Sequence, residues 1–319
     1  MIFYLESNVI STLSRFDEGR RFSRWCKSNR IRVLYSEILI QEIMKTKEDH
    51  LLNRLLSTLS EVTTNRAESI SFRHSEEFIS EVRRLRKEWL IAEPNTKLIR
   101  WQIQRQLRNW SLLKRKNFSL IKAEWKNDIH YDFGKREAVK AQKEFKEQLR
   151  IGEEGVRPMF QYKNNLGQVK KVYLDEPTNQ WREDRFLTWK AAVHERMPQI
   201  SDYADFAAPY LLKDALSDDH DALSFWFEEV EEESMPFNRI TALTWYKQLF
   251  QKINRGNSGD TRHSNFLLLA DYFITADVTF YNIISEVAKE VPIKSKIILI
   301  DRNKKNVAAQ ITEAISQAV

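Results

Sequence analysis

Residues 259–277 read GDTRHSNFLLLADYFITAD, and this stretch decides the fold that the sequence predicts. We expect Asp260 to open a helix that contains the apolar run Phe266 to Leu269. A short strand is expected over Tyr272 to Thr275, because at least every second residue there is apolar or β-branched. Asp277 then starts a second helix, in which apolar residues recur at helical spacing as far as Val287. The stretch therefore predicts a helix–strand–helix unit.

The same pattern continues towards both ends of the chain. Ile297 to Ile300 is the next expected strand, and a helix from Asn306 to Ala318 closes the sequence. At the start, a strand over Ile2 to Leu5 precedes a helix from Ser7 to Phe16. A further strand over Ile31 to Leu34 precedes a helix that Ser36 is expected to cap. Strands alternating with helices predict an α/β fold, a mostly parallel sheet with helices on both faces.

The middle of the chain, residues 51–254, has a different pattern dominated by helical periods. One expected helical face groups Phe78, Val82, Leu85 and Trp89, and a second groups Ile99, Ile103, Leu107, Trp110 and Leu113. A hairpin is expected over Met159 to Leu174, with Asn164, Asn165 and Gly167 in its turn. We therefore predict a discontinuous core, residues 1–50 and 255–319, interrupted by a large, mainly α-helical insertion that binds nucleic acid or a partner.

Positive charge is concentrated in the insertion. The whole chain has a formal charge of +6, but between Arg83 and Lys126 there are thirteen Lys or Arg residues against three Glu. Four of these cations fall close to one line on a single expected helix, namely Lys97, Arg100, Arg108 and Arg115. Such a stripe favours phosphate contacts with a nucleic acid, and an ordinary solvated helix face is the alternative.

Composition excludes several classes of protein. The single cysteine, Cys26, rules out a disulfide within the chain and a cysteine-rich zinc site. No apolar run approaches the roughly 20 residues that span a bilayer, so no membrane partner is expected. The opening MIFYLESNVIS has no basic segment before its short apolar stretch, which is unlike a signal peptide. These features together indicate a cytoplasmic protein.

Four carboxylates are expected near one edge of the predicted sheet. Sites in parallel α/β sheets form at the carboxyl ends of the strands. Glu6 directly follows the first strand and Asp277 follows the strand at Tyr272 to Thr275. Glu42 lies on the helix after the second strand, and Asp260 lies on the helix before the third. Each acid also has a plainer interpretation: Glu6 as a helix-start acid, Glu42 as an exposed residue, and the two Asp residues as helix caps.

Converging carboxylates suit a hard divalent cation. Four close carboxylates repel one another, whereas Mg²⁺ or Mn²⁺ neutralises them and prefers oxygen ligands. Such an ion lowers the pKa of a bound water and stabilises charge on a phosphodiester. The acids therefore predict hydrolysis of phosphodiester bonds.

The motifs resemble those of PIN-domain nucleases. Residues 4–10, YLESNVI, resemble the first motif of that family, and residues 36–43, SEILIQEI, resemble the second. Residues 259–263 and 270–277 resemble the third and fourth, in which an Asp opens a helix and Thr-x-Asp follows a strand. The resemblance covers about 120 residues at the two ends. One position departs from it, because residue 6 is Glu where the family usually has Asp.

The resemblance implies roles for individual residues. Glu6, Glu42, Asp260 and Asp277 would be the catalytic, metal-binding acids. Ser7, Asn8 and Thr275 would be supporting polar groups, and His263 would either orient a carboxylate or phosphate or be a structural histidine. The implied fold is PIN-like, the implied activity is a metal-dependent endoribonuclease with RNA as substrate, and the implied settings include toxin-like and antiviral defence nucleases, with an inhibitory or regulatory protein partner.

Two other classes of function stay open on the sequence. The longer Glu6 side chain shifts the carboxylate by about 1.5 Å relative to Asp, which is one bond length. A catalytically weak or inactive PIN-like scaffold that binds RNA or a protein is therefore the main alternative. A helical interaction subunit whose ends merely resemble the family is the other.

Overall fold

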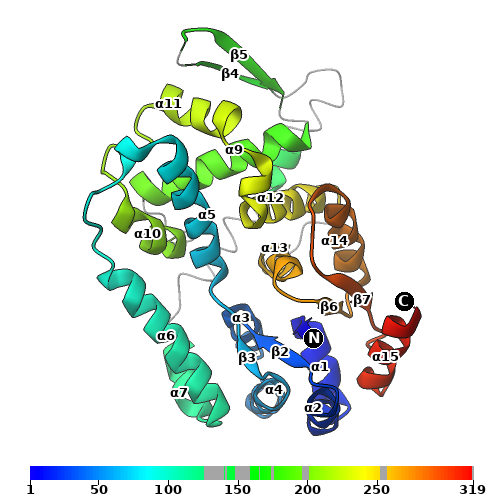
Figure 1. The fold of residues 1–319 in the computed structure, drawn as a ribbon. Helices are drawn as coiled ribbons and strands as arrows, with labels where there is room; N and C mark the ends of the chain where they lie inside the picture. The colour runs from blue at the N-terminus through cyan, green and yellow to red at the C-terminus, as the bar shows by residue number, and fades with distance from the viewer. Residues whose placement is uncertain are drawn as a thin grey trace. The chain divides into compact units, whose positions relative to one another are not determined.

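The structure is a computed structural model that describes residues 1–125, 140, 142–147, 159–164, 166–173, 176–195, 201–251 and 257–317. The chain forms two compact units, and each is discontinuous in sequence (Figure 1). The first unit comprises Met1–Ser69, Gln104–Asp128 and Arg262–Val319, and the second comprises Ile70–Ile103 and Ile129–Thr261.

The first unit contains a five-stranded parallel sheet in the order β3-β2-β1-β6-β7. Its strands are β1 (Ile2–Leu5), β2 (Arg32–Tyr35), β3 (Asn65–Arg66), β6 (Tyr272–Thr275) and β7 (Lys296–Leu299). The expected α/β class with a parallel sheet is thereby confirmed. Two of the expected strands have the bounds that the sequence predicted, and the other two are shifted by one residue. The fifth, β3, was not predicted, because a strand of two residues has no readable period.

The central strand explains why the sheet is parallel and buried. Phe3, Tyr4 and Leu5 follow one another in β1 and all three are completely buried. A strand with one face in solvent would alternate apolar with polar residues, whereas this strand is apolar throughout because both faces are covered. Helix α1 packs on β6, α2 packs on β2, and α14 packs on β6 and β7.

Nine helical segments of the first unit surround this sheet in the described part of the chain. They are α1 (Ser7–Arg15), α2 (Gly19–Ser28), α3 (Glu37–Ile43), α4 (Asp49–Val62), α7 (Phe118–Trp125), η7 (Ser264–Leu268), α14 (Val278–Glu290), α15 (Val307–Gln317) and the second half of α6 (Lys97–Lys114). The helix α13 (Asn257–His263) begins in residues of the second unit and ends in the first. The closing helix matches its expected range up to Gln317, and Ala318 lies outside the described residues.

The second unit is built mainly of helices around a tryptophan-rich core. Its elements include α5 (Ile70–Leu85), η1 (Lys87–Trp89), α9 (Pro177–Lys190), η2 (Ala191–Glu195), α10 (Ser201–Ala207), η4 (Ala208–Tyr210), α11 (Asp219–Ser224), η5 (Phe225–Glu229), η6 (Glu232–Ser234) and α12 (Pro236–Gln248). Phe78 stacks on Trp189 with ring centroids 4.3 Å apart and on Trp226 at 5.8 Å. These rings belong to the buried apolar cluster at the centre of the second unit.

The expected hairpin is present in the second unit. Strands β4 (Met159–Lys163) and β5 (Val169–Tyr173) pair antiparallel. Gly167 has φ 75°, a conformation that favours glycine, and the Asn164 side chain accepts hydrogen bonds from the backbone N–H groups of Leu166 and Gln168. Asn165 lies outside the described residues.

The boundaries of the units differ from the expected boundaries of the core. Residues 51–69 and 104–128 were placed in the insertion, yet they belong to the unit that contains the sheet. Helix α4 packs on α1, α2 and α3, and β3 extends the sheet beside β2. The helical period of α4 showed that it has an apolar face, but it could not show which partner covers that face. No described helix has the length and apolarity needed to cross a membrane.

Candidate active site

Glu6 lies at the carboxyl end of the central strand. Its backbone N–H donates to the carbonyl of Ile274 at 3.0 Å, so the ladder between β1 and β6 continues one residue beyond β1. Its side chain is buried, with 4% of the residue exposed, and accepts a hydrogen bond from the Thr275 hydroxyl. The parallel register that pairs Leu5 with Ile274 places Thr275 beside Glu6. Two residues 269 positions apart are thus fixed by strand pairing.

Thr275 also connects Glu6 with the loop that carries Asp277. A threonine hydroxyl has one hydrogen to donate and two lone pairs to accept with. Thr275 Oγ1 donates to the Glu6 carboxylate and accepts from the backbone N–H of Asp277 at 3.0 Å. Asn8 contributes a parallel contact, since its Oδ1 accepts from the backbone N–H of Ala276 at 2.9 Å. The residues of the first and fourth motifs therefore form one hydrogen-bonded group.

Asp277 is exposed and caps helix α14. Its Oδ1 accepts from the backbone N–H of Phe280 at 2.9 Å, which is the contact expected of a helix N-cap. The capping role that the sequence left open is thus confirmed. A carboxylate has two oxygens and about four lone-pair positions, so capping through one oxygen leaves acceptor capacity for another ligand.

Glu42 lies on α3 within a second group of polar side chains. Its Oε2 is 2.9 Å from Nε2 of His263, which is completely buried, and its Oε1 is 3.7 Å from Nζ of Lys45. Burial alone would raise the pKa of the Glu42 carboxyl, but His263, Lys45 and a hydrogen bond from Ser7 outweigh it, so the pKa lies well below its usual range. Glu42 is therefore held as a carboxylate. The exposed-residue interpretation of Glu42 is wrong, and His263 orients this carboxylate.

Tyr4 fixes the other side of the His263 ring. The phenol oxygen of Tyr4 lies 2.5 Å from Nδ1 of His263 and 3.1 Å from the hydroxyl of Ser36. A carboxylate can only accept, so Nε2 of His263 donates to Glu42. Burial raises the pKa of Tyr4 well above its usual value, which keeps the phenol protonated.

The two glutamates lie within electrostatic range of the same phenol. Burial is the largest cause of the raised pKa of Tyr4, and the negative charges of Glu42 and Glu6 add to it. Both carboxylates therefore approach the carboxyl end of β1, one from the strand itself and one from α3. Sequence analysis did not single out Tyr4 or Ser36 for this network. Ser36 was expected to cap α3, but its side chain makes no capping hydrogen bond and instead meets Tyr4.

Asp260 lies inside a helix, where the sequence predicted a helix start. Helix α13 begins at Asn257, so Asp260 lies in its first turn, where a carboxylate interacts favourably with the helix dipole. The residue is partly buried and belongs to the second unit by its contacts. It precedes His263 by three positions on the same helix. Its role as a metal ligand stays a prediction.

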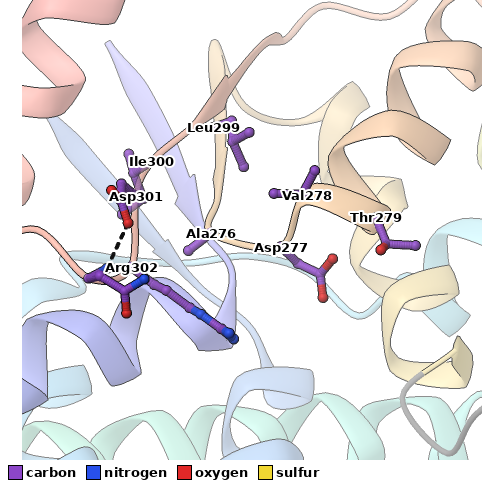
Figure 2. A pocket seen from close by; sticks show the side chains of 9 residues that line it. Ala276, Asp277, Val278, Thr279, Leu299, Ile300, Asp301 and Arg302 are labelled. Carbon is purple, nitrogen blue, oxygen red and sulfur yellow. Dashed lines mark hydrogen bonds between the residues drawn. The ribbon is translucent and has the colours of Figure 1, made fainter.

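A hollow at the carboxyl ends of β6 and β7 adjoins Asp277. Figure 2 shows Asp277 on the loop after β6, and Asp301 and Arg302 on the segment after β7, around this hollow. Asp301 accepts from the backbone N–H of Asn303 at 2.9 Å. The sequence did not single out Asp301, Arg302 and Asn303. A signal was present, since they directly follow an expected strand and so lie at the edge where sites form.

The basic stripe on α6 is only partly as expected. Lys97, Arg100, Arg108 and Arg115 are all exposed, but Arg108 forms an ion pair with Glu124 at 2.8 Å. The apolar face expected opposite the stripe is wrong at Leu107, which is 47% exposed. Gln106 and Asn109 are buried in its place, since Gln106 accepts from Arg66 at 3.1 Å. The spacing of apolar residues along a sequence does not reveal a polar side chain that is buried together with its hydrogen-bonding partner.

The carboxylates near β1 are of the kind that a hard divalent cation prefers as ligands. Within the described residues, no three or more His, Cys, Asp or Glu side chains gather at the spacing of a metal site. Two carboxylates, those of Glu6 and Glu42, lie near enough to Tyr4 to raise its pKa, and the Ser7 hydroxyl is bonded to Glu42. Magnesium is commonly held by one or two carboxylates and keeps several waters, so two carboxylates are a sufficient protein contribution.

Comparisons with models of known families, with curated proteins and with solved structures returned no match for this chain. The resemblance to PIN-domain nucleases therefore rests on the four motifs.

Proposed function

We propose that the chain is a PIN-like, metal-dependent endoribonuclease. The observation that carries this proposal is that the buried Glu6 follows the central strand of a parallel sheet, while the half-buried Glu42 is linked to Tyr4 of the same strand through His263. Ligand sites of such sheets form at this edge. Like charges that share a small volume need a cation, and carboxylate oxygens are the ligands that Mg²⁺ and Mn²⁺ prefer.

Each side chain of the site then has a defined task. Glu6 and Glu42 would hold the ion. A role of Asp277 and Asp260 as further ligands follows from the family resemblance alone, because the described residues do not bring three such side chains together at the spacing of a metal site. Thr275 and Asn8 hold the two loops of the site together through the contacts to Glu6 and Ala276. His263, oriented by Tyr4, keeps Glu42 in the ionised form and in one orientation. Such supporting contacts usually change metal affinity or activity by about 10–100-fold.

The chemistry proposed is hydrolysis of a phosphodiester bond. A bound Mg²⁺ or Mn²⁺ supplies an activated water and neutralises charge that develops on the phosphate. The exposed carboxylate of Asp277 lies on the hollow at the sheet edge, where a strand could approach it. The choice of RNA as substrate, and a toxin-like or defence role with an inhibitory protein partner, follow from the family resemblance.

One observation favours the second candidate, an RNA-binding scaffold without activity. Glu42 already has two basic neighbours, His263 and Lys45, and these partly neutralise the carboxylate that an ion would need. In that case the polar network at β1 would be structural. The two candidates predict the same RNA binding and opposite results in a cleavage assay.

The test is cleavage of a labelled single-stranded RNA in Mn²⁺, in Mg²⁺ and in EDTA. The variants are Glu6→Gln, Glu42→Gln, Asp260→Asn and Asp277→Asn, with Glu313→Gln on the exposed face of α15 as the matched control. Cleavage should require the metal, and each site variant should lose on the order of 100-fold or more, whereas the control keeps its rate. Equal cleavage by all five variants, or binding without cleavage by the unaltered protein, would discard the nuclease.

A further inference from the structure

A second hollow of the first unit is lined mainly by cations, and its residues come from three helical segments. The positive side chains come from α2 and from the end of α6 with the turn after it, and they are Arg20, Arg24, Lys27, Lys114 and Lys116. The end of α4 contributes the only carboxylate of the described lining, Glu61. Five positive groups and one negative group leave a formal charge of +4 around one hollow. A local excess of this size attracts anions.

The single carboxylate is shared and cannot neutralise its neighbours. Glu61 Oε1 lies 3.3 Å from Nε of Arg20 and 3.2 Å from Nζ of Lys116. In the described part of the chain, no ion pair involves Arg24 or Lys27, and both are exposed. Two cations are thus paired with one acid, and two more face the solvent with their charges uncompensated.

Lys114 fixes a positive charge within this hollow. Its Nζ donates to the backbone carbonyls of Ser60 at 2.6 Å and of Thr63 at 2.7 Å, at the carboxyl end of α4. An ammonium group has three N–H donors, so one remains for another acceptor. Burial lowers the pKa of Lys114, and the charges of Lys27 and Lys116 lower it further. The cations therefore repel one another, and an anion in the hollow would relieve that repulsion.

The hollow is separate from the candidate active site. Helix α2 runs towards the amino end of β2, and α4 runs towards the amino end of β3. Lys27 and Glu61, near the ends of these helices, therefore lie towards the amino edge of the sheet. Glu6 lies at the opposite edge, after β1. The described lining consists of charged residues and the two serines Ser23 and Ser60, without an apolar side chain.

We propose that this hollow binds phosphate groups of a nucleic-acid strand. Phosphodiester oxygens accept hydrogen bonds and carry charge, which is what lysine and arginine side chains satisfy. An acidic protein is the less suitable partner, because the centres of protein interfaces are apolar and this lining is not. The proposal extends the proposed function, since it adds a contact for the RNA backbone far from the carboxylates. Contacts to phosphate position a strand without reading its sequence.

The experiment measures RNA affinity in EDTA, where binding is separated from cleavage. A labelled single-stranded RNA and a DNA of the same sequence are titrated with the full chain between 50 and about 300 mM salt. The variant is Arg24→Gln with Lys27→Gln, and the control is Lys289→Gln with Lys305→Gln, which removes the same charge elsewhere in the unit. The double variant should lower the slope of log affinity against log salt by roughly 1.4 for both strands.

At about 0.1 M salt this change of slope corresponds to an affinity loss on the order of tenfold. The control pair and the swap Arg24→Lys with Lys27→Arg should stay within about twofold of the unaltered protein. Unchanged RNA affinity in the double variant, or an equal loss in the control pair, overturns the proposal. So does a result in which the double variant loses binding to polyglutamate and retains binding to RNA, because the partner would then be an acidic protein. A failure of cleavage with binding intact contradicts only the nuclease.

Discussion

At the scale of single residues, Thr275 connects two parts of the candidate site. Its hydroxyl is completely buried and lies between the Glu6 carboxylate and the backbone N–H of Asp277. Removal of that hydroxyl leaves a buried carboxylate with one donor fewer and the backbone N–H of Asp277 without its acceptor. The cost of such orphaned groups, about 1–3 kcal/mol each, exceeds the cost of the lost volume.

We therefore expect Thr275→Val, which keeps the shape, to lower the free energy of unfolding by about 1–3 kcal/mol. Cleavage in Mn²⁺ should fall by at least about tenfold, because Glu6 and the Asp277 loop lose their connection. Thr275→Ser restores the hydroxyl and should recover most of the activity. Urea unfolding and initial cleavage rates measure the two effects. A Val variant as active as the Ser variant would show that the hydroxyl does not support catalysis.

The sequence pointed to the candidate acids but to only part of the network that holds them. Glu6, Glu42 and Asp277 were accessible because each follows a readable strand or lies on the next helix. The network of Tyr4, Ser36 and His263 was not accessible in the same way. Tyr4 lies within an apolar strand, so its pattern indicates core, and only the fold brings His263 to it across 259 positions.

At the scale of elements, the N-terminus of helix α12 in the second unit is capped by a side chain from another helix. Pro236 occupies its first turn, and the N–H groups of Phe237 and Asn238 donate to the Glu77 carboxylate at 2.8 and 3.0 Å. Asn238 Nδ2 adds a third hydrogen bond to the same side chain at 2.8 Å. A helix without a capping residue of its own thus takes its cap from α5, which a local capping rule cannot predict.

Glu77→Ala should therefore lower the free energy of unfolding by about 1–3 kcal/mol, because two backbone donors at a buried helix start lose their acceptor. The control is Glu76→Ala on the same helix, whose carboxylate meets Arg73 at 2.7 Å on the surface and should change stability by less than about 0.5 kcal/mol. Hydrogen exchange at Phe237 and Asn238 locates the effect. Similar losses in the two variants would refute the shared cap.

The same glutamate gives the second unit a pH dependence. Burial raises the pKa of Glu77 to about 7, although three hydrogen bonds from Phe237 and Asn238 oppose the shift. The folded state then binds a proton that the unfolded state has released, so stability should fall as pH rises from about 4.5 to 7. Glu77→Gln cannot titrate and should flatten that part of the curve. Urea midpoints measured at half-unit steps of pH check this, and an equally steep fall in the Gln variant would contradict it.

At the scale of the whole molecule, the chain crosses between its two units several times. Residues 104–128 return to the unit of the sheet after a segment that belongs to the other unit. The sequence predicted a single insertion because the helical period changes after residue 50 and returns to strands only near residue 270. The helical spacing of apolar residues shows that a helix has an apolar face. Which element covers that face depends on contacts between segments that are distant in the sequence. The sheet and its edge were therefore predictable, whereas the unit boundaries were not.

Lys114 and Trp110 are among the residues that connect the second half of α6 to the rest of the first unit. Trp110 meets the ring of Tyr35 at 5.0 Å, and the Lys114 ammonium lies 5.1 Å from the Trp110 ring while it donates to the carbonyls at the end of α4. Lys114→Met keeps the aliphatic length and loses the donors, so we expect a loss of about 1–2 kcal/mol. Arg115→Met, on the exposed side of the next position, should change stability by less than about 0.5 kcal/mol. Hydrogen exchange should increase in the last turn of α4 and in the second half of α6 for Lys114→Met alone. If protection there is unchanged, Lys114 does not hold α6 to the unit, and other contacts, such as those of Trp110 with Tyr35 and of Gln106 with Arg66, must suffice.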